Sequence, residues 1–270
     1  MKKIEISIIY ICFYIQNYIF MDWTKYYLQD TCSLTIPDSF DEPLNNLPIG
    51  VKYLNTGNCF DQSVDNLPNS IISIKFGIYF NKPVDNLPNS VINITFGDCF
   101  NQHIKSLPQS IQSITFGSRF NKSIKYIPSS VKHLTFGDDF NQRINEDLLP
   151  HGLTHLTFGF CFNQPVNKSL LPHTIKHLKF GFRFNQPVNE GVLPSGLTHL
   201  KFGFCFNRPV DNLPTSITHL RLGECFSEKL DNLPYALEEI TVCDSYILDI
   251  KLPLNCKIVR VKCKIVRVKF

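Results

Sequence analysis

At 270 residues the chain is long enough for one large domain or two ordinary ones. Apolar residues make up 43% of it, which is ample for a core and excludes a disordered chain. The net charge of +4 is too small to indicate a nucleic-acid partner, so none is expected. The 10 cysteines fit neither a secreted disulfide framework nor a CxxC zinc site, so we interpret them as reduced thiols in the cytoplasm.

An apolar stretch begins the chain. Lys2 and Lys3 precede residues 4–20, which are mostly apolar but are interrupted by Glu5 and other polar residues. The stretch is short for a membrane-spanning helix and lacks a small-residue cleavage site. We therefore expect residues 1–30 to be an N-terminal extension or cap, and we expect no membrane partner. A membrane anchor or secretory signal is the alternative, as is an upstream extension before a start at Met21.

The rest of the sequence repeats with a period of about 20 residues. Its marker is a Leu-Pro or Ile-Pro pair, whose successive prolines are 20, 20, 20, 20, 22, 22, 22, 20, 20 and 19 residues apart. These prolines are Pro48, Pro68, Pro88, Pro108, Pro128, Pro150, Pro172, Pro194, Pro214, Pro234 and Pro253. A fixed period of this length is typical of a solenoid, in which each unit shields the apolar side of its neighbours.

Each unit is predicted to hold one short strand, as the unit after Pro88 illustrates. In Ile94-Thr95-Phe96 the outer two side chains should point inward and Thr95 outward, because strand side chains alternate. The glycine that follows, here Gly97, is expected to provide a tight bend with positive φ. The extra residues of the longer units always fall between Phe-Asn and Leu-Pro, which indicates a tolerant outer loop. We therefore predict a leucine-rich-repeat-like solenoid, with a parallel β-sheet on its concave face and irregular or short helical turns on its convex face.

A Phe-Asn pair recurs at the same place in seven units. The asparagines are Asn81, Asn101, Asn121, Asn141, Asn163, Asn185 and Asn207. A buried amide needs hydrogen-bond partners, and an amide repeated in every turn can find them on the backbone of its own turn and the next. We predict a structural asparagine ladder rather than a ligand site.

Histidine recurs directly before the inward leucine of five predicted strands. The histidines are His133, His155, His177, His199 and His219, and the same face carries Lys179, Lys201 and Arg221 two residues later in three of these units. Earlier units hold small polar residues at the histidine positions. We predict a partner-binding surface on the concave face for an acidic protein segment, sensitive to pH near about 6.5, where histidine titrates. The alternative is that duplication copied an exposed histidine that has no function.

The C-terminal end departs from the repeat, although Val259 and Val261 still fit the strand register after Pro253. Lys and Arg alternate there with Ile and Val, which indicates a strand whose charges protect an exposed sheet edge, or else a basic surface for an acidic partner. We assign residues 31–262 to the repeat solenoid and residues 263–270 to a basic C-terminal tail.

The sequence holds no recognisable catalytic or metal-binding constellation. His151 with His155 and His173 with His177 are spaced like zinc ligands on a helix. Here the interval crosses from a loop into a strand, so the helical geometry is not expected. A Gly-rich phosphate loop and a nucleophile elbow are also missing. We therefore expect no enzyme, no cofactor and no metal.

The iterated motif Phe-Asn-x-x-Val/Ile, followed by Leu-Pro-x-x-Ile/Leu-x-x-Leu/Ile-x-Phe-Gly, resembles the FNIP repeat of amoebae and giant DNA viruses. Residues 80–84 and 162–166 carry the name-giving stretch, and the resemblance covers roughly residues 40–234. The family is related to leucine-rich repeats, which implies the same fold. Some viral members resemble F-box proteins, which implies a substrate-receptor role in a ubiquitin-ligase complex.

Together these patterns predict a non-enzymatic protein-protein interaction module that binds a partner on its concave face. A ubiquitin-ligase substrate receptor is one alternative, and a membrane-tethered or structural repeat protein is another. The expected partner is a protein, and the basic residues of the predicted surface favour an acidic one.

Overall fold

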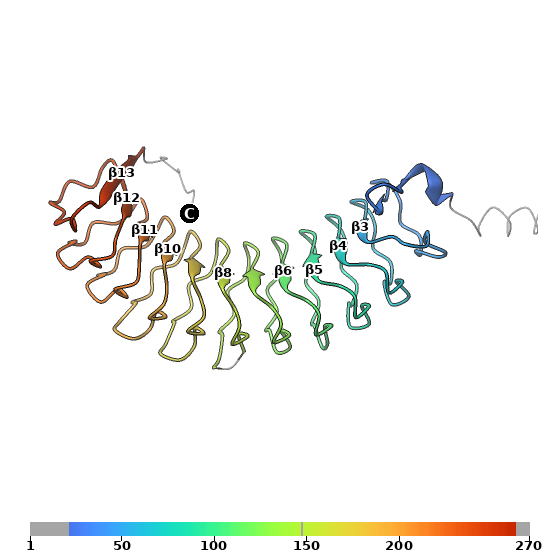
Figure 1. Ribbon diagram of the computed structural model, residues 1–270, viewed down its shortest axis with the longest axis horizontal. Helices are drawn as coiled ribbons and strands as arrows, with labels where there is room; N and C mark the ends of the chain where they lie inside the picture. The colour runs from blue at the N-terminus through green and yellow to red at the C-terminus, as the bar shows by residue number, and fades with distance from the viewer. Residues whose placement is uncertain (1–21, 147, 263–270) are drawn as a thin grey trace, which may run out of the picture.

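The computed structural model describes residues 22–146 and 148–262. These residues wind into an arc of similar turns, each of which contributes one short strand to a single sheet (Figure 1). Within the described residues the sheet has 13 strands, and their order in space is their order in the sequence. The strands lie toward the inner side of the arc and irregular turns form its outer side (Figure 1). The predicted leucine-rich-repeat-like solenoid is therefore confirmed.

Twelve strands of the described residues pair in parallel, one from each turn. They are β2 (Ser33–Thr35), β3 (Tyr53–Asn55), β4 (Ser73–Lys75), β5 (Asn93–Thr95), β6 (Ser113–Thr115), β7 (His133–Thr135), β8 (His155–Thr157), β9 (His177–Lys179), β10 (His199–Lys201), β11 (His219–Arg221), β12 (Glu239–Cys243) and β13 (Lys257–Val261). The middle residue of each three-residue strand is buried, and the residues before and after it are at least partly exposed. The pairing register is constant, so equivalent residues of successive turns form straight columns across the sheet.

Two β-turns bracket each strand from β3 to β12. The first follows the Leu-Pro pair, where the amide of Val91 donates to the carbonyl of Pro88 at 3.1 Å. The second follows the strand, where the amide of Phe100 donates to the carbonyl of Gly97 at 3.2 Å. Proline contributes only its carbonyl to the first turn, so its missing amide donor costs nothing there. The repeat spacing of Pro and Gly thus sets where each turn of the solenoid bends.

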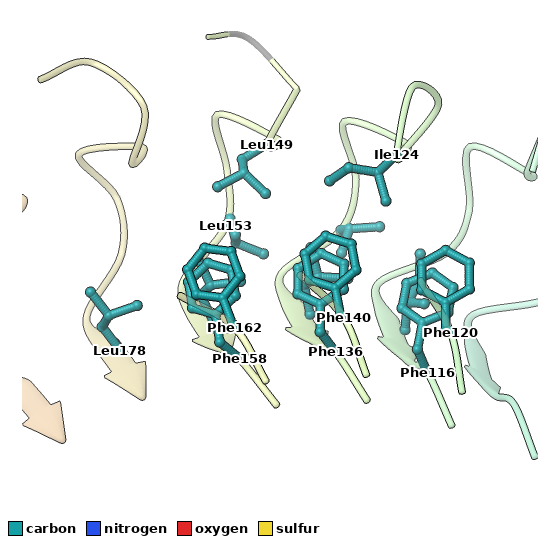
Figure 2. Packing of buried hydrophobic residues seen from close by; sticks show 14 of the residues in the cluster. Phe116, Phe120, Ile124, Phe136, Phe140, Leu149, Leu153, Phe158, Phe162 and Leu178 are labelled. Carbon is teal, nitrogen blue, oxygen red and sulfur yellow. The ribbon is translucent and has the colours of Figure 1, made fainter. Parts of the chain in front are cut away.

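Two columns of phenyl rings run through the core. One column comes from the Phe-Gly pairs and the other from the Phe-Asn pairs, and the two rings of a turn stack with centroids 3.8 Å apart in Phe76 and Phe80. Between turns the centroids are 5.7 Å apart for Phe76 and Phe96 and 6.1 Å apart for Phe80 and Phe100. Figure 2 shows three such stacked pairs, Phe116 with Phe120, Phe136 with Phe140, and Phe158 with Phe162. Each pair is covered by the turns on both sides, so the stability of a unit depends on its neighbours.

The glycine of each Phe-Gly pair has a different role from the one predicted. Among the described glycines only Gly50 and Gly191 have positive φ, and neither follows a strand phenylalanine. A Cβ on Gly97 would instead overlap the carbonyl oxygen of Gly77 in the preceding turn. The same overlap recurs at the glycine of every Phe-Gly pair from Gly77 to Gly203, and at the equivalent Gly57 and Gly223. The predicted positive-φ bend was therefore wrong: glycine is required because the backbones of successive turns touch at this point.

The N-terminal end of the described solenoid is covered by the 3-10 helix η1 (Trp23–Lys25) and by β1 (Tyr27–Leu28), which pairs antiparallel with β2. The Trp23 ring meets the Phe40 ring edge-on, with centroids 5.6 Å apart, and its indole Nε1 donates to the carbonyl of Asn45 at 3.1 Å. These contacts shield the first turn from water. The apolar stretch at residues 4–20 lies outside the described residues.

At the other end β13 pairs in parallel with β12, and Val259 and Val261 stand in register with Thr241 and Cys243. The basic tail predicted at residues 263–270 lies outside the described part of the chain. No helix in residues 22–146 and 148–262 is long and apolar enough to cross a membrane.

Candidate partner-binding surface

The outward side of the sheet, which we call the sheet face, is made by the first and third residues of the strands. In β9 the side chains of His177 and Lys179 are exposed at least in part, while Leu178 between them is 2% exposed. The alternation follows from the strand period of two, because Leu178 must point into the core. The constant register then places His177 beside His155 and His199, as equivalent residues of β8 and β10.

The five predicted histidines form one continuous stack on the sheet face, which we call the histidine column. Successive ring centroids are 4.5, 4.2, 4.3 and 4.5 Å apart along the column. The column consists of His133, His155, His177, His199 and His219. The rings stack because each strand step brings the next imidazole to about the spacing of a parallel sheet, roughly 4.8 Å.

Threonine hydroxyls orient three rings of the histidine column. The Thr154 hydroxyl lies 3.0 Å from the carbonyl of Lys132 and 2.9 Å from Nδ1 of His155. The same carbonyl already accepts from the backbone amides of Thr154 and His155, so the hydroxyl can donate either to this carbonyl or to Nδ1. Thr198 beside His199 and Thr218 beside His219 repeat the arrangement. In each case the contact holds Nδ1 of the ring against the hydroxyl of the preceding threonine.

The histidine column resists protonation at its centre. Partial burial lowers the pKa of His155, His177 and His199 below the ordinary value of 6.5, and repulsion from neighbouring histidines lowers these pKa values further. Glu238 acts in the opposite direction on His199. Charging one ring therefore makes it harder to charge the next.

These lowered pKa values predict a pH-dependent stability. The unfolded chain binds protons at these histidines more readily, so the free energy of unfolding should fall as the pH drops through 6.5 and level off below the lowered pKa values. Replacing His155, His177 and His199 together with Ser should flatten this dependence. Urea unfolding at about pH 8 and about pH 5 measures it. The exposed loop histidines His103, His151 and His173, changed to Ser, are the control, and equal flattening by both variants would contradict the assignment.

A second column of the sheet face carries the predicted cations. Lys179, Lys201 and Arg221 occupy the third positions of β9, β10 and β11 and are paired in register. None of the three forms an ion pair with a carboxylate in residues 22–146 and 148–262. Partial burial, and then the charges of Arg221 and Lys179, lower the pKa of Lys201. We call these three residues the cation column.

The two columns border a groove of about 380 Å³. The histidine column from His155 to His219 forms one side, the cation column forms the other, and the strand backbone at the inward leucines lies between them. Glu239 lies at the C-terminal end of the groove, where it forms an exposed ion pair with Lys257 at 3.6 Å. The sequence-predicted partner-binding residues from β8 to β11 are thus brought together in one groove, whereas His133 in β7 continues the stack beyond it.

Three aromatic residues beside the cation column were missed by the sequence analysis. Phe160, Phe182 and Phe204 directly follow the Phe-Gly pairs of three successive turns, and their ring centroids are 4.4 and 4.6 Å apart. Phe160 is 38% exposed, and the guanidinium of Arg183 lies 5.6 Å from its ring centroid. The sequence feature that could have identified them is an aromatic residue at a repeat position that most other turns fill with a polar residue. We call these residues the phenylalanine column.

The recurring asparagines make a backbone-supporting ladder. The side-chain oxygen of Asn141 accepts from the backbone amide of Asn163, one turn on, at 3.0 Å. The other asparagines repeat this link, each side-chain oxygen accepting from the backbone amide of the equivalent residue one turn on. These asparagines are Asn81, Asn101, Asn121, Asn163, Asn185 and Asn207. The run of links begins at Asp41, whose side chain accepts from the amide of Asp61, and the amide of Ser227 ends it. The ladder is partly buried, and its hydrogen bonds hold successive turns together.

Cysteine and metal chemistry add nothing to this surface. Cys32, Cys59, Cys99, Cys161, Cys205, Cys225 and Cys256 are free thiols. Cys243 is disulfide-bonded, so the prediction that all cysteines are reduced was wrong at this position. Within the described ranges, residues 22–146 and 148–262, no group of three His, Cys, Asp or Glu side chains is placed to hold a metal ion.

Short parallel strands on the inner side, irregular turns outside and one asparagine link per turn define a solenoid of leucine-rich-repeat type. The FNIP Repeat pattern matches residues 40–77, 60–99, 80–119, 100–127, 120–161 and 162–205. These matches cover more than half of the sequence, so the chain belongs to the FNIP repeat family. The predicted resemblance is confirmed, and solenoids of this type typically serve protein-protein interaction.

Two solved structures resemble the fold. CroV588, a giant-virus protein described as a novel circular LRR protein, is 38% identical with a TM-score of 0.74, over 84% of this chain and 35% of that one. YopM from Yersinia enterocolitica WA-314 is 20% identical with a TM-score of 0.52, over 82% of this chain and 43% of that one, and supports the fold alone. This chain thus spans about a third of the length of CroV588. No curated protein has a matching sequence.

Proposed function

We propose that the chain is a non-enzymatic protein-interaction module that binds an acidic protein segment on its concave sheet face, across β9 to β11. The single observation that carries this proposal is the cation column. Lys179, Lys201 and Arg221 stand on adjacent strands without a carboxylate partner in the described residues. Like charges in register repel each other, so the fold itself gains nothing from this arrangement.

An acidic partner would relieve that repulsion. Carboxylates placed along the groove would favour the charged form of Lys201, whose pKa is lowered in the free protein. The neighbouring histidine column would add positive charge as the pH falls, which should tighten binding of the same partner. Folding requires neither the cation column nor the histidine column, which supports a role of both columns in recognition. We also propose a cytoplasmic setting, supported by the seven free cysteines of the described residues, although Cys243 is disulfide-bonded.

The test is a binding measurement with a defined acidic probe. A fluorescein-labelled oligoglutamate peptide of about eight residues spans the cation column, and its fluorescence anisotropy reports the dissociation constant. Changing Lys179, Lys201 and Arg221 together to Ser should weaken binding about tenfold or more, since three exposed charge contacts are lost. Added salt screens these charges, so the difference in affinity between wild type and the triple variant should become smaller as the salt concentration rises.

The matched control removes the same charge elsewhere. Lys105, Lys125 and Lys168 are exposed in outer loops, and their triple change to Ser also lowers the net charge by three. This control should bind the probe within about twofold of wild type. Equal losses in both variants would show that only net charge matters, and the proposal would then be wrong.

A further inference from the structure

The phenylalanine column is not needed by the repeat. At the same repeat position the side-chain oxygen of Asn58 accepts from the next turn's amide in Ile78 at 3.5 Å, and that of Asp98 accepts from Ser118 at 3.4 Å. Polar side chains thus support the fold there. In three successive turns they are replaced by Phe160, Phe182 and Phe204, which leave apolar surface at the solvent.

These aromatic rings line a second groove, of about 510 Å³. The phenylalanine column forms one wall, and Lys179, Lys201 and Arg221 form the other. The same three cations therefore form the ridge between this groove and the groove beside the histidine column. We call the second groove the phenylalanine groove.

The ends of the phenylalanine groove are acidic. Asp138 lines it one turn before Phe160, and Glu224 lines it one turn after Phe204. Between these two carboxylates lie four strand steps of about 4.8 Å, so the groove is roughly 19 Å long. At about 3.3 Å per residue, that length holds five or six residues of an extended peptide.

We infer that the phenylalanine groove binds the apolar side chains of an extended acidic peptide, whose carboxylates contact the cation column. The inference rests on the proposed function, because both use the same three cations. Side chains of an extended chain alternate in direction, so a sequence that alternates acidic and apolar residues directs its two kinds of side chain to different walls of the groove. Charge complementarity directs the acidic side chains of the peptide to the cation column, and the exposed rings direct its apolar side chains to the phenylalanine column.

The geometry disfavours a single-stranded nucleic acid. Base stacking needs an open aromatic face, and the rings of Phe160, Phe182 and Phe204 already stack on one another at 4.4 and 4.6 Å. Only the ring edges and the outer faces of the stack remain open to a base.

The experiment compares two fluorescein-labelled peptides of about eight residues, one alternating Glu and Leu and the other alternating Glu and Ser. They carry the same charge and differ only in apolar side chains. Wild type should bind the Glu-Leu peptide about tenfold more tightly. The triple variant F160N/F182N/F204N, which restores a residue used at this repeat position in another turn, should lose that preference. It should bind the Glu-Ser peptide as wild type does.

The control variant Y79N/Y126N/Y235N removes three exposed aromatic residues elsewhere and should keep the preference. Thermal unfolding checks that both variants are folded, and the single variant F160N, at the end of the stack, should show a partial loss if the triple variant is unfolded. A retained preference in the folded triple variant, no preference in wild type, or tighter binding of a thymidine oligonucleotide would each overturn the inference. Failure of the proposed function looks different: the Glu-Ser peptide would then bind wild type and the K179S/K201S/R221S variant equally.

Discussion

Gly137→Ala should unfold the centre of the solenoid. Gly137 is buried, and a Cβ there would overlap the carbonyl oxygen of Gly117 and approach the amide of Ser118 to 3.0 Å. These atoms are backbone on both sides, so no side chain can move away to make room. Relief requires two turns to separate, which breaks the strand pairing of β6 with β7 and the phenyl stack beneath it. We expect a loss of about 4 kcal/mol or more in the free energy of unfolding, measured by urea denaturation.

Gly196→Ala is the matched control for this prediction. The nearest atom to a Cβ at Gly196 is the Nζ of Lys176, at 2.8 Å, and this atom ends a flexible side chain. Lys176 can give up its hydrogen bond to the Gly196 carbonyl and turn into solvent, so we expect a change within about 0.5 kcal/mol. Similar losses in the two variants would show that glycine acts through chain flexibility rather than through contact between turns.

The glycine also shows which part of the fold a sequence specifies. The repeat period, the strand positions and the inward residues could be predicted, because each produces a periodic apolar pattern. The reason for the glycine could not, because a positive φ and a tight contact both select glycine and leave the same letter in the sequence. Only the spacing of the turns, which brings Gly117 against Gly137, distinguishes the two.

The candidate surface likewise has residues that the sequence predicts and residues that it does not. The histidine and cation columns could be predicted, because an alternating strand fixes which side each residue faces. Phe160, Phe182 and Phe204 were missed because each lies outside the strand, in a turn whose direction the period of two does not specify. Their stacking is a contact between residues 22 apart, so it emerges only when the turns are superimposed. The depth of the grooves and the lack of carboxylate partners for the cation column likewise depend on three-dimensional packing.

One surface thus combines the histidine column, which gains positive charge as the pH falls, with a column of lysine and arginine side chains. The centre of the histidine column contributes little positive charge near neutral pH, because the pKa values of His155, His177 and His199 are lowered. An acidic segment bound between them would favour protonation of the imidazoles, and lower pH would favour binding in return. The histidine column, which makes the free solenoid less stable in acid, is therefore expected to make its complex tighter there.

Phe140→Ala should cost nearly as much stability as Gly137→Ala, for the opposite reason. Phe140 is 0% exposed, and its ring stacks on Phe136 at 3.9 Å within the turn and lies 6.1 Å from both Phe120 and Phe162 in the neighbouring turns. Removing it leaves a cavity that three turns line, and the hydrogen-bonded backbone of these turns limits collapse. We expect a loss of about 3–5 kcal/mol in the free energy of unfolding, measured by urea denaturation.

The same chemical change at Phe160 provides the comparison. That ring is 38% exposed and stacks on Phe182 on the surface, so its removal leaves no enclosed cavity, and we expect Phe160→Ala to cost about 1 kcal/mol or less. Amide exchange should show the loss from Phe140→Ala in the strands β6, β7 and β8 first, because each turn is stabilised by its neighbours. A uniform loss of protection from β2 to β13 would instead mean that the solenoid unfolds as a single unit, and that coupling extends well beyond adjacent turns.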